Sequence, residues 1–169
     1  MLSYAAAVAA PKQGRSGATE ADLSAMSVAL SEARSAMAHG DVPVGAVVLV
    51  DGAIVAQRHN EREMSGDPTA HAELLALRDA ANVVGQWRLD SATLVVSLEP
   101  CPMCAGAAVA ARLGRLVFGA ADPKAGACGS LYNLCADPRL NHEVELIGGV
   151  LAELSGEMLE GFFAELRKA

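Results

Sequence analysis

The chain has 169 residues, 52% of them hydrophobic and 20% charged, which is enough for one domain with a buried core. This composition excludes a disordered chain, and since no run of eighteen apolar residues occurs, no transmembrane helix is expected. Twenty acidic and thirteen basic residues give a formal net charge of −7, which disfavours a broad basic surface for nucleic acid.

The N-terminal segment differs in composition from the rest of the chain. Residues 1–10 are rich in alanine but lack the basic start of a signal peptide, so a cytoplasmic location is expected. Turn-forming residues follow at Pro11, Gly14, Ser16 and Gly17. Large apolar side chains are few in this part of the chain. We therefore expect a mobile tail over residues 1–20 and a single folded domain over residues 21–169.

The first predicted elements are a helix and a hairpin. A helix should begin near Asp22, because apolar residues recur at helical spacing, and Gly40 can supply its left-handed stop. An apolar strand is expected over Val44–Val50. The pair Asp51-Gly52 then predicts a tight turn into a second strand over Ala53–Gln57.

The rest of the chain alternates strands with helices. We expect two inner helices, three further strands and a terminal helix, in the order helix from about His71 to Ala81, strand Thr93–Leu98, helix to about Ala111, strand Leu116–Gly119, strand Val144–Ile147 and helix from Val150 onward. Residues 122–143 hold Pro, Gly, Asn and Asp and are expected to form loop or short helix. This alternation predicts an α/β fold in layers.

Two short motifs thirty positions apart carry the chemistry. His71 is followed by Glu73, and Cys101 and Cys104 form a Cys-x-x-Cys pair that begins after Pro100. One imidazole and two thiolates are three of the four ligands that zinc prefers, and a fourth open position is typical of a catalytic zinc site. Glu73 is suited to act as the acid and base for a zinc-bound water.

Each motif alone has a simpler interpretation. A lone Cys-x-x-Cys pair is often a redox pair or half of a structural zinc site, and a lone His-x-Glu carries almost no information. A closed structural site would need a fourth ligand, for which Cys128, Cys135, His59 and His142 are the available side chains. We expect Cys128 and Cys135 to be small core residues instead, because free cysteine packs as an apolar group.

Several further segments extend the pattern. They are Val42-Pro43-Val44-Gly45-Ala46-Val47, Asn60, Asp67-Pro68-Thr69-Ala70-His71-Ala72-Glu73, Leu98-Glu99-Pro100-Cys101-Pro102-Met103-Cys104, Phe118-Gly119-Ala120, Asp122, Lys124, Gly129-Ser130-Leu131, Asn141-His142 and Phe162-Phe163. From about residue 22 to residue 166, the chain resembles the bacterial tRNA-specific adenosine deaminases of the cytidine deaminase superfamily. This likeness is more specific than the zinc motif, which cytosine and guanine deaminases share.

The resemblance implies a fold, an activity and partners. The fold is a three-layer α/β/α arrangement around a five-stranded mixed sheet, cytidine deaminase-like, in a homodimer. The activity is hydrolytic deamination of adenosine to inosine at the wobble position of a tRNA anticodon, with one Zn2+ per chain. The implied partner is therefore the anticodon stem-loop of a tRNA, and no membrane is involved.

The resemblance also implies roles by position. His71, Cys101 and Cys104 would bind zinc, and Glu73 would carry protons. Asn60 would hydrogen-bond the flipped base in a pocket lined by Val44. Four residues would lie along the anticodon loop, namely Asp122, Lys124, Asn141 and Phe163.

Two departures and two alternative functions remain. The basic stretch that often ends the family is weaker here, at residues 164–168, and Ala121 replaces a basic residue before Asp122. One alternative is a free-base or nucleoside deaminase acting on guanine or cytosine, which would not need the loop residues. The other is a non-catalytic zinc or RNA-binding module, which would have no use for Glu73.

Overall fold

A five-stranded mixed sheet forms the centre of the protein, whose computed structural model describes residues 17–168. The strands are β1 (Gly45–Val50), β2 (Ala53–His59), β3 (Ala92–Leu98), β4 (Arg115–Ala120) and β5 (Glu145–Ile147). Their order across the sheet is β2-β1-β3-β4-β5. Strand β1 pairs antiparallel with β2 and β3, whereas β3, β4 and β5 run parallel.

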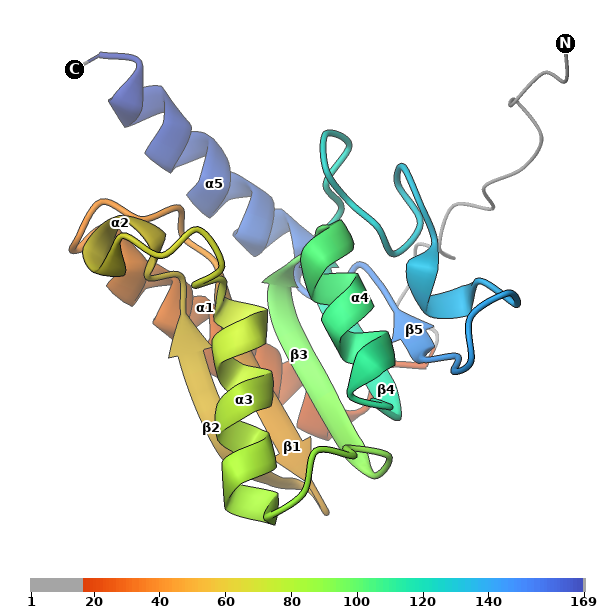
Figure 1. Cartoon of the computed structure of the whole chain (residues 1–169). Coiled ribbons are helices and arrows are strands. Elements are labelled where there is room, and N and C mark those ends of the chain that lie inside the picture. Colours follow the sequence, from red (N-terminus) through yellow and green to blue (C-terminus); the bar gives the residue numbers. More distant parts are fainter. Residues whose placement is uncertain (1–16, 169) are drawn as a thin grey trace, which may run out of the picture.

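Helices cover both faces of this sheet (Figure 1). They are α1 (Glu20–Met37), α2 (Arg62–Ser65), α3 (Ala72–Val84), α4 (Pro102–Ala110) and α5 (Ala152–Leu166), with a short 3-10 helix η1 (Leu134–Ala136). Helices α3 and α4 lie side by side on one face, and α1 and α5 lie on the other. The predicted three-layer α/β/α fold with a five-stranded mixed sheet is therefore confirmed.

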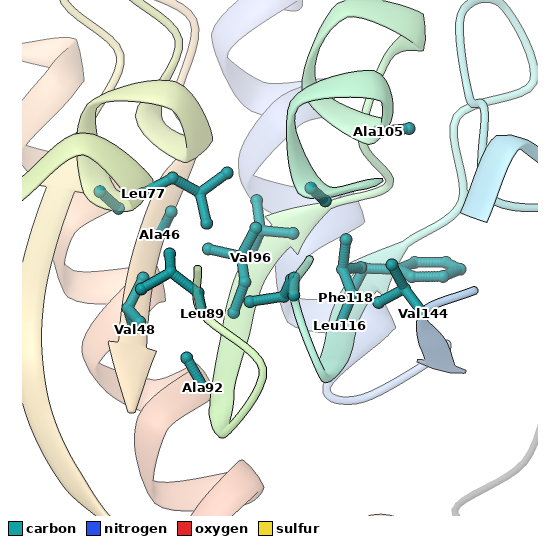
Figure 2. Packing of buried hydrophobic residues seen from close by; sticks show 14 of the residues in the cluster. Ala46, Val48, Leu77, Leu89, Ala92, Val96, Ala105, Leu116, Phe118 and Val144 are labelled. Carbon is teal, nitrogen blue, oxygen red and sulfur yellow. The ribbon is translucent and has the colours of Figure 1, made fainter. Parts of the chain in front are cut away.

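The core is divided in two by the alternation of side chains along the strands. Val48 and Val96 pack toward α3 and α4, whereas Val47 and Val95 pack toward α1. Strand side chains point alternately to opposite faces, so one continuous apolar run supplies both layers. Figure 2 shows the first layer, in which Leu77 of α3 approaches the strands.

Two elements differ from the expected boundaries. Helix α1 begins at Glu20 because Thr19 forms a capping box with Asp22, in which each side chain accepts a hydrogen bond from the other residue's backbone N–H. The short helix α2 was not predicted. The carboxylate of Asp41 holds it by accepting hydrogen bonds from the backbone N–H groups of Glu63 and Met64, at 2.9 and 3.2 Å.

Residues 1–16 of the tail predicted over residues 1–20 lie outside the described residues, Gly17 to Thr19 lead directly into α1, and Glu20 is its first residue. Across residues 17–168, no helix combines the length and the apolar composition that crossing a membrane requires.

Candidate metal centre and active site

The starts of two helices meet at the candidate site. His71 is the N-cap of α3, and Cys101 is the N-cap of α4, with Cys104 in the first turn of the same helix. Pro102 at the first position of α4 is preorganised for a helix start, which fixes where Cys101 stands. Neither N-cap side chain caps its own helix, so both are free to face a common point.

The three ligand atoms form a nearly equilateral triangle. Nδ1 of His71 lies 3.7 Å from Sγ of Cys101 and 3.5 Å from Sγ of Cys104, and the two sulfurs are 3.7 Å apart. Zinc with tetrahedral geometry, Zn–S of about 2.3 Å and Zn–N of about 2.05 Å places two sulfurs about 3.8 Å apart and sulfur and nitrogen about 3.6 Å apart. The triangle therefore has the dimensions of a tetrahedral zinc site.

The electrostatics of this triangle favour a thiolate. The pKa of Cys101 is lowered to about 4, first by its hydrogen bond with the Cys104 sulfur and then by the neighbouring His71. The pKa of the Cys104 thiol is raised by the same hydrogen bond and by burial. Thiolate is the form that binds metal, so binding of a cation here would release the Cys104 proton.

Glu73 stands beside this triangle without a partner for one oxygen. The residue lies in the first turn of α3 and is 4% exposed. Its Oε2 is fully buried and makes no hydrogen bond within the described part of the chain. Burial raises the pKa of the carboxyl. A buried carboxyl oxygen without a partner has a free lone pair for a water or a substrate.

No fourth protein ligand joins the group. Over residues 17–168, His71, Cys101 and Cys104 are the one set of three or more His, Cys, Asp and Glu side chains whose ligand atoms all lie within 4.8 Å of one another. The alternative ligands bond elsewhere: Cys128 and Cys135 are buried with their sulfurs 3.9 Å apart, His59 lies 2.7 Å from Glu32, and His142 lies 2.7 Å from the carbonyl oxygen of Leu113. An open fourth position is thus available.

Asn60 connects the strand layer to the start of α3. Its Oδ1 accepts a hydrogen bond from the backbone N–H of Ala72 at 3.0 Å, and its Nδ2 donates to the carbonyl oxygen of Val42 at 3.1 Å. The backbone N–H of Asn60 also donates to the carbonyl oxygen of Val44, whose side chain is 5% exposed. Since an amide nitrogen carries two hydrogens, Asn60 has one donor left for a ligand.

Comparison with known proteins identifies the family. The family model of MafB19-like deaminases matches residues 20–167. The chain belongs to this deaminase family. It is 51% identical over 143 residues to a tRNA-specific adenosine deaminase of Bacillus subtilis, covering 85% of this chain and 89% of the relative. A tRNA-specific adenosine deaminase of Haemophilus influenzae is 45% identical over 151 residues, which cover 89% of this chain and 87% of that relative.

A solved structure supports the same assignment. It comes from a study of A-to-I editing by tRNA:A34 deaminases at the wobble position of transfer RNA, and its TM-score to this chain is 0.78 at 43% identity. The alignment covers 80% of this deaminase and 99% of the solved chain. The family resemblance inferred from the motifs is confirmed, and the protein is a hydrolytic enzyme by its family.

The segment after β4, which carries two of the predicted contact residues, is hydrogen-bonded to the residues just before Cys101. The backbone N–H of Ala127 donates to the carbonyl oxygen of Pro100, the residue before Cys101, at 2.8 Å. Asp122 is half-buried, and its Oδ1 accepts a hydrogen bond from the backbone N–H of Lys124 at 2.9 Å. Lys124 itself is exposed.

Glu99 organises this segment, a role that no sequence motif indicated. Glu99 is 2% exposed and accepts hydrogen bonds from the segment's backbone. Its signal in the sequence is a carboxylate between the apolar end of a strand and Pro100, a place where an uncompensated charge would be costly.

The other two predicted contact residues lie elsewhere. Arg112 holds Asn141, because its Nη1 donates to Asn141 Oδ1 at 2.6 Å. This contact lies just beyond the C-terminal end of α4, whereas Cys101 stands at the N-terminal end of that helix. An RNA contact of Asn141 stays a prediction that this placement does not support. Phe163 is 42% exposed in the last half of α5 and touches Phe162 edge-on, with ring centroids 5.4 Å apart.

Proposed function

We propose that this deaminase converts adenosine to inosine by hydrolysis at the wobble position of a tRNA anticodon. The observation that carries the proposal is the open triangle of His71, Cys101 and Cys104 beside the unpartnered carboxyl of Glu73. It occurs in a chain that is similar over most of its length to proteins named tRNA-specific adenosine deaminases. Such a site suits the addition of water to a planar ring carbon followed by loss of ammonia.

We propose zinc as the metal, one ion per chain. His71, Cys101 and Cys104 would hold it, because the triangle has tetrahedral dimensions and its donors are one nitrogen and two sulfurs. When bound, zinc supplies Lewis-acid activation of a water, whose pKa it lowers toward about 7. Two thiolates offset the charge of the ion, and the two helix N-termini favour thiolates at this point.

Glu73 would move the protons of the reaction. Its Oε2 has an unused lone pair that can accept the proton of the attacking water. The protonated carboxyl can then deliver protons to N1 of adenine and to the leaving amine. Burial raises the pKa of the Glu73 carboxyl, which favours the protonated form that can return a proton.

Asn60 and Val44 would recognise the base. The second hydrogen on Nδ2 of Asn60 is available to an acceptor on the base edge, because Val42 takes only one. Val44 supplies an apolar wall. The adenine must leave its stack to reach this pocket, which costs a few kcal/mol and least in an unpaired loop.

The RNA backbone would meet the rim of the site. Lys124 is an exposed cation on the segment whose backbone bonds to Glu99 and Pro100, just before Cys101, and Asp122 shapes its turn. Phe163 offers an exposed ring for stacking on an unpaired base. Because tRNA is the proposed substrate and the cysteines are free thiols, we place the enzyme in the cytoplasm.

We also propose that the protein is a homodimer. Large apolar side chains are exposed on the loop after β4 and on α5, among them Leu131, Tyr132, Leu154 and Leu166. Exposed apolar groups of this size are typical of a surface that another subunit covers. Sedimentation at micromolar concentration should give twice the chain mass, and a monomer would contradict the proposal.

The substrate is tested by direct assay of the purified protein. An anticodon stem-loop with adenosine at the wobble position should yield inosine, and the same stem-loop with guanosine there should yield no product. Free guanine, free cytosine and free adenosine are run in parallel. Turnover of a free base equal to that of the stem-loop would favour the small-molecule deaminase, and tight binding of the stem-loop without turnover would favour the non-catalytic RNA-binding module.

A further inference from the structure

A single buried carboxylate organises the segment at the rim of the site. Glu99 follows the last residue of β3 and stands two positions before Cys101. Its Oε1 accepts hydrogen bonds from the backbone N–H groups of Cys128 at 3.0 Å and Ser130 at 2.9 Å. Its Oε2 accepts from the backbone N–H of Asp122 at 2.9 Å and from the hydroxyl of Ser130.

These four hydrogen bonds saturate the carboxylate and come from one segment. A carboxylate has about four acceptor positions, and residues 122–130 fill them all. Burying an uncompensated charge is costly, so the segment must keep this shape for the charge to be tolerated. The segment and the carboxylate therefore determine each other's positions.

The segment approaches the Glu99 side chain closely at Gly126. A Cβ placed on Gly126 would lie 2.4 Å from Cδ and Oε2 of Glu99 and 2.6 Å from the carbonyl oxygen of Asp122. The backbone N–H of Ala127 donates to the carbonyl oxygen of Pro100 at 2.8 Å, which joins the segment to the chain just before Cys101, and the backbone N–H of Glu99 donates to the carbonyl oxygen of Ala120 at 2.8 Å, which joins the ends of β3 and β4. The segment thus wraps closely around the side chain that precedes the metal-binding motif.

We propose that Glu99 is a positioning residue for RNA binding, whose carboxylate holds residues 122–130 in the shape that presents Lys124 beside the His71, Cys101 and Cys104 site. This inference rests on the proposed function, because it takes the RNA backbone as the group that Lys124 meets. In a chain of net charge −7, one cation contributes to RNA binding only if it is held in the right place. An ordered segment also avoids an entropy cost at the moment of binding.

The variant Glu99→Gln tests the proposal. The amide keeps the size of the side chain but turns an NH2 group toward backbone donors, so at least one of them loses its acceptor. We expect the KM for the anticodon stem-loop to rise about tenfold while kcat changes less than about threefold, because the missing order is regained only on binding. Hydrogen–deuterium exchange of residues 121–133 should become faster.

A matched control separates positioning from general stability. Asp22 is also a 2% exposed carboxylate, but it bonds Arg115 at 2.6 and 2.9 Å and the backbone N–H of Thr19, at the start of α1 on the other side of the sheet. Asp22→Asn should lower the unfolding temperature without changing the KM or the exchange of residues 121–133. A merely structural role of Glu99 would give the same pattern in Glu99→Gln.

Two further variants keep the proposal open to refutation if Glu99→Gln does not fold. Ser130→Ala removes one of the four hydrogen bonds and should shift the KM and the exchange in the same direction by a smaller factor. Lys124→Ala should raise the KM on its own, and adding Glu99→Gln or Ser130→Ala to it should raise the KM little further, since both would act through Lys124.

The outcomes distinguish this inference from the proposed function. If the wild-type protein neither binds nor deaminates the stem-loop, the proposed function fails and the RNA-positioning role fails with it. If the wild-type protein is active but Glu99→Gln leaves the KM or the exchange of residues 121–133 unchanged, the positioning role alone is overturned. Additive effects of Lys124→Ala and Ser130→Ala would also overturn it.

Discussion

Glu73 is the side chain at the site whose proposed chemistry can be tested most directly. Glu73→Gln keeps its shape but cannot carry a proton, so inosine formation in single turnover should fall by about 10²–10⁴-fold or more. Metal content and the unfolding temperature should be retained, because one buried oxygen of Glu73 has no partner to lose. Glu63→Gln on the exposed face of α2 is the control, and activity of Glu73→Gln within about tenfold of the parent would exclude the proton-transfer role.

The metal prediction concerns Cys104. Cys104→Ala removes one corner of a triangle whose edges are 3.5–3.7 Å, so metal analysis should show less than stoichiometric zinc and no deamination. Cys128→Ala removes an equally buried thiol outside the triangle and should keep about one zinc per chain. Full zinc occupancy in Cys104→Ala would contradict the ligand set.

Asn60 should matter for stability as well as for the base. Asn60→Ala leaves the Ala72 N–H and the Val42 carbonyl without partners, which should cost about 1–3 kcal/mol in the free energy of unfolding. Loss of the base contact should in addition lower kcat/KM for the stem-loop by about 10- to 100-fold.

A second buried polar contact provides the comparison for Asn60. Ser97→Ala removes the acceptor of the Gly45 N–H, a 3.1 Å hydrogen bond, and should destabilise the fold by a similar amount. Its kcat/KM should stay near that of the parent. Equal losses of kcat/KM in Ser97→Ala and Asn60→Ala, measured below both unfolding temperatures, would assign Asn60 a structural role alone.

The sequence indicated the role of residues whose own chemistry is distinctive more readily than the role of residues that depend on distant parts of the fold. His71, Cys101 and Cys104 have a recognisable spacing, and the structure brings their ligand atoms together. The role of Glu99 depends on backbone N–H groups 23 to 31 positions away, which no local pattern encodes. The same holds for the bond from Ala72 to Asn60, which only the folded chain reveals.

At the scale of elements, α1 and β1 meet at a contact that only glycine allows. A Cβ on Gly45 would lie 1.9 Å from the carbonyl oxygen of Ala29 and 2.6 Å from the backbone nitrogen of Ala33. Both neighbours are backbone atoms of a helix and cannot rotate away. The close approach of α1 to the first residue of β1 therefore depends on the absence of a side chain.

Gly45→Ala should destabilise the protein by about 3 kcal/mol or more, because helix and strand must separate. Urea unfolding measures the change. Gly161→Ala is the control: it lies in α5 with no atom within 4 Å of the added Cβ, and it should be neutral or stabilising by up to about 1 kcal/mol. A loss below about 1 kcal/mol for Gly45→Ala would show that α1 is not tightly packed there.

Elements with local signals were predicted, and those held by distant side chains were not. The turn at Asp51 and Gly52 joins β1 to β2 as expected, since Asp-Gly favours the backbone of a tight turn, and φ is 50° at Asp51 and 78° at Gly52. Helix α2 has four residues and no buried side chain. Its start depends on the carboxylate of Asp41, more than twenty positions earlier, so a local pattern could not indicate it.

At the scale of the whole molecule, the acidic charge limits how RNA can bind. Several of the basic side chains are neutralised within the fold, as Arg58 is by Glu61 and Asp79, and Arg115 is by Asp22. Lys168, near the end of α5, pairs with Glu165 at 2.7 Å. The ion pairs among the described residues do not include Lys124 or Arg167, nor Arg34, Arg62 or Arg78, so only a few cations are available to meet phosphates.

Binding of the anticodon stem-loop should therefore depend only weakly on salt. Three to four phosphate contacts to a single-stranded loop give a log–log slope of about −2 to −3, since each contact contributes about −0.7. Lys124→Ala should make the slope shallower by about 0.7. Arg88→Ala should leave the slope unchanged, because Arg88 pairs with Asp90 beyond the C-terminal end of α3, whereas His71 lies at the N-terminal end of that helix. Fluorescence anisotropy from low to moderate salt measures all three slopes. A parent slope steeper than about −5 would require a broad basic surface that a chain of net charge −7 does not offer, and equal changes in the two variants would remove Lys124 from the RNA interface.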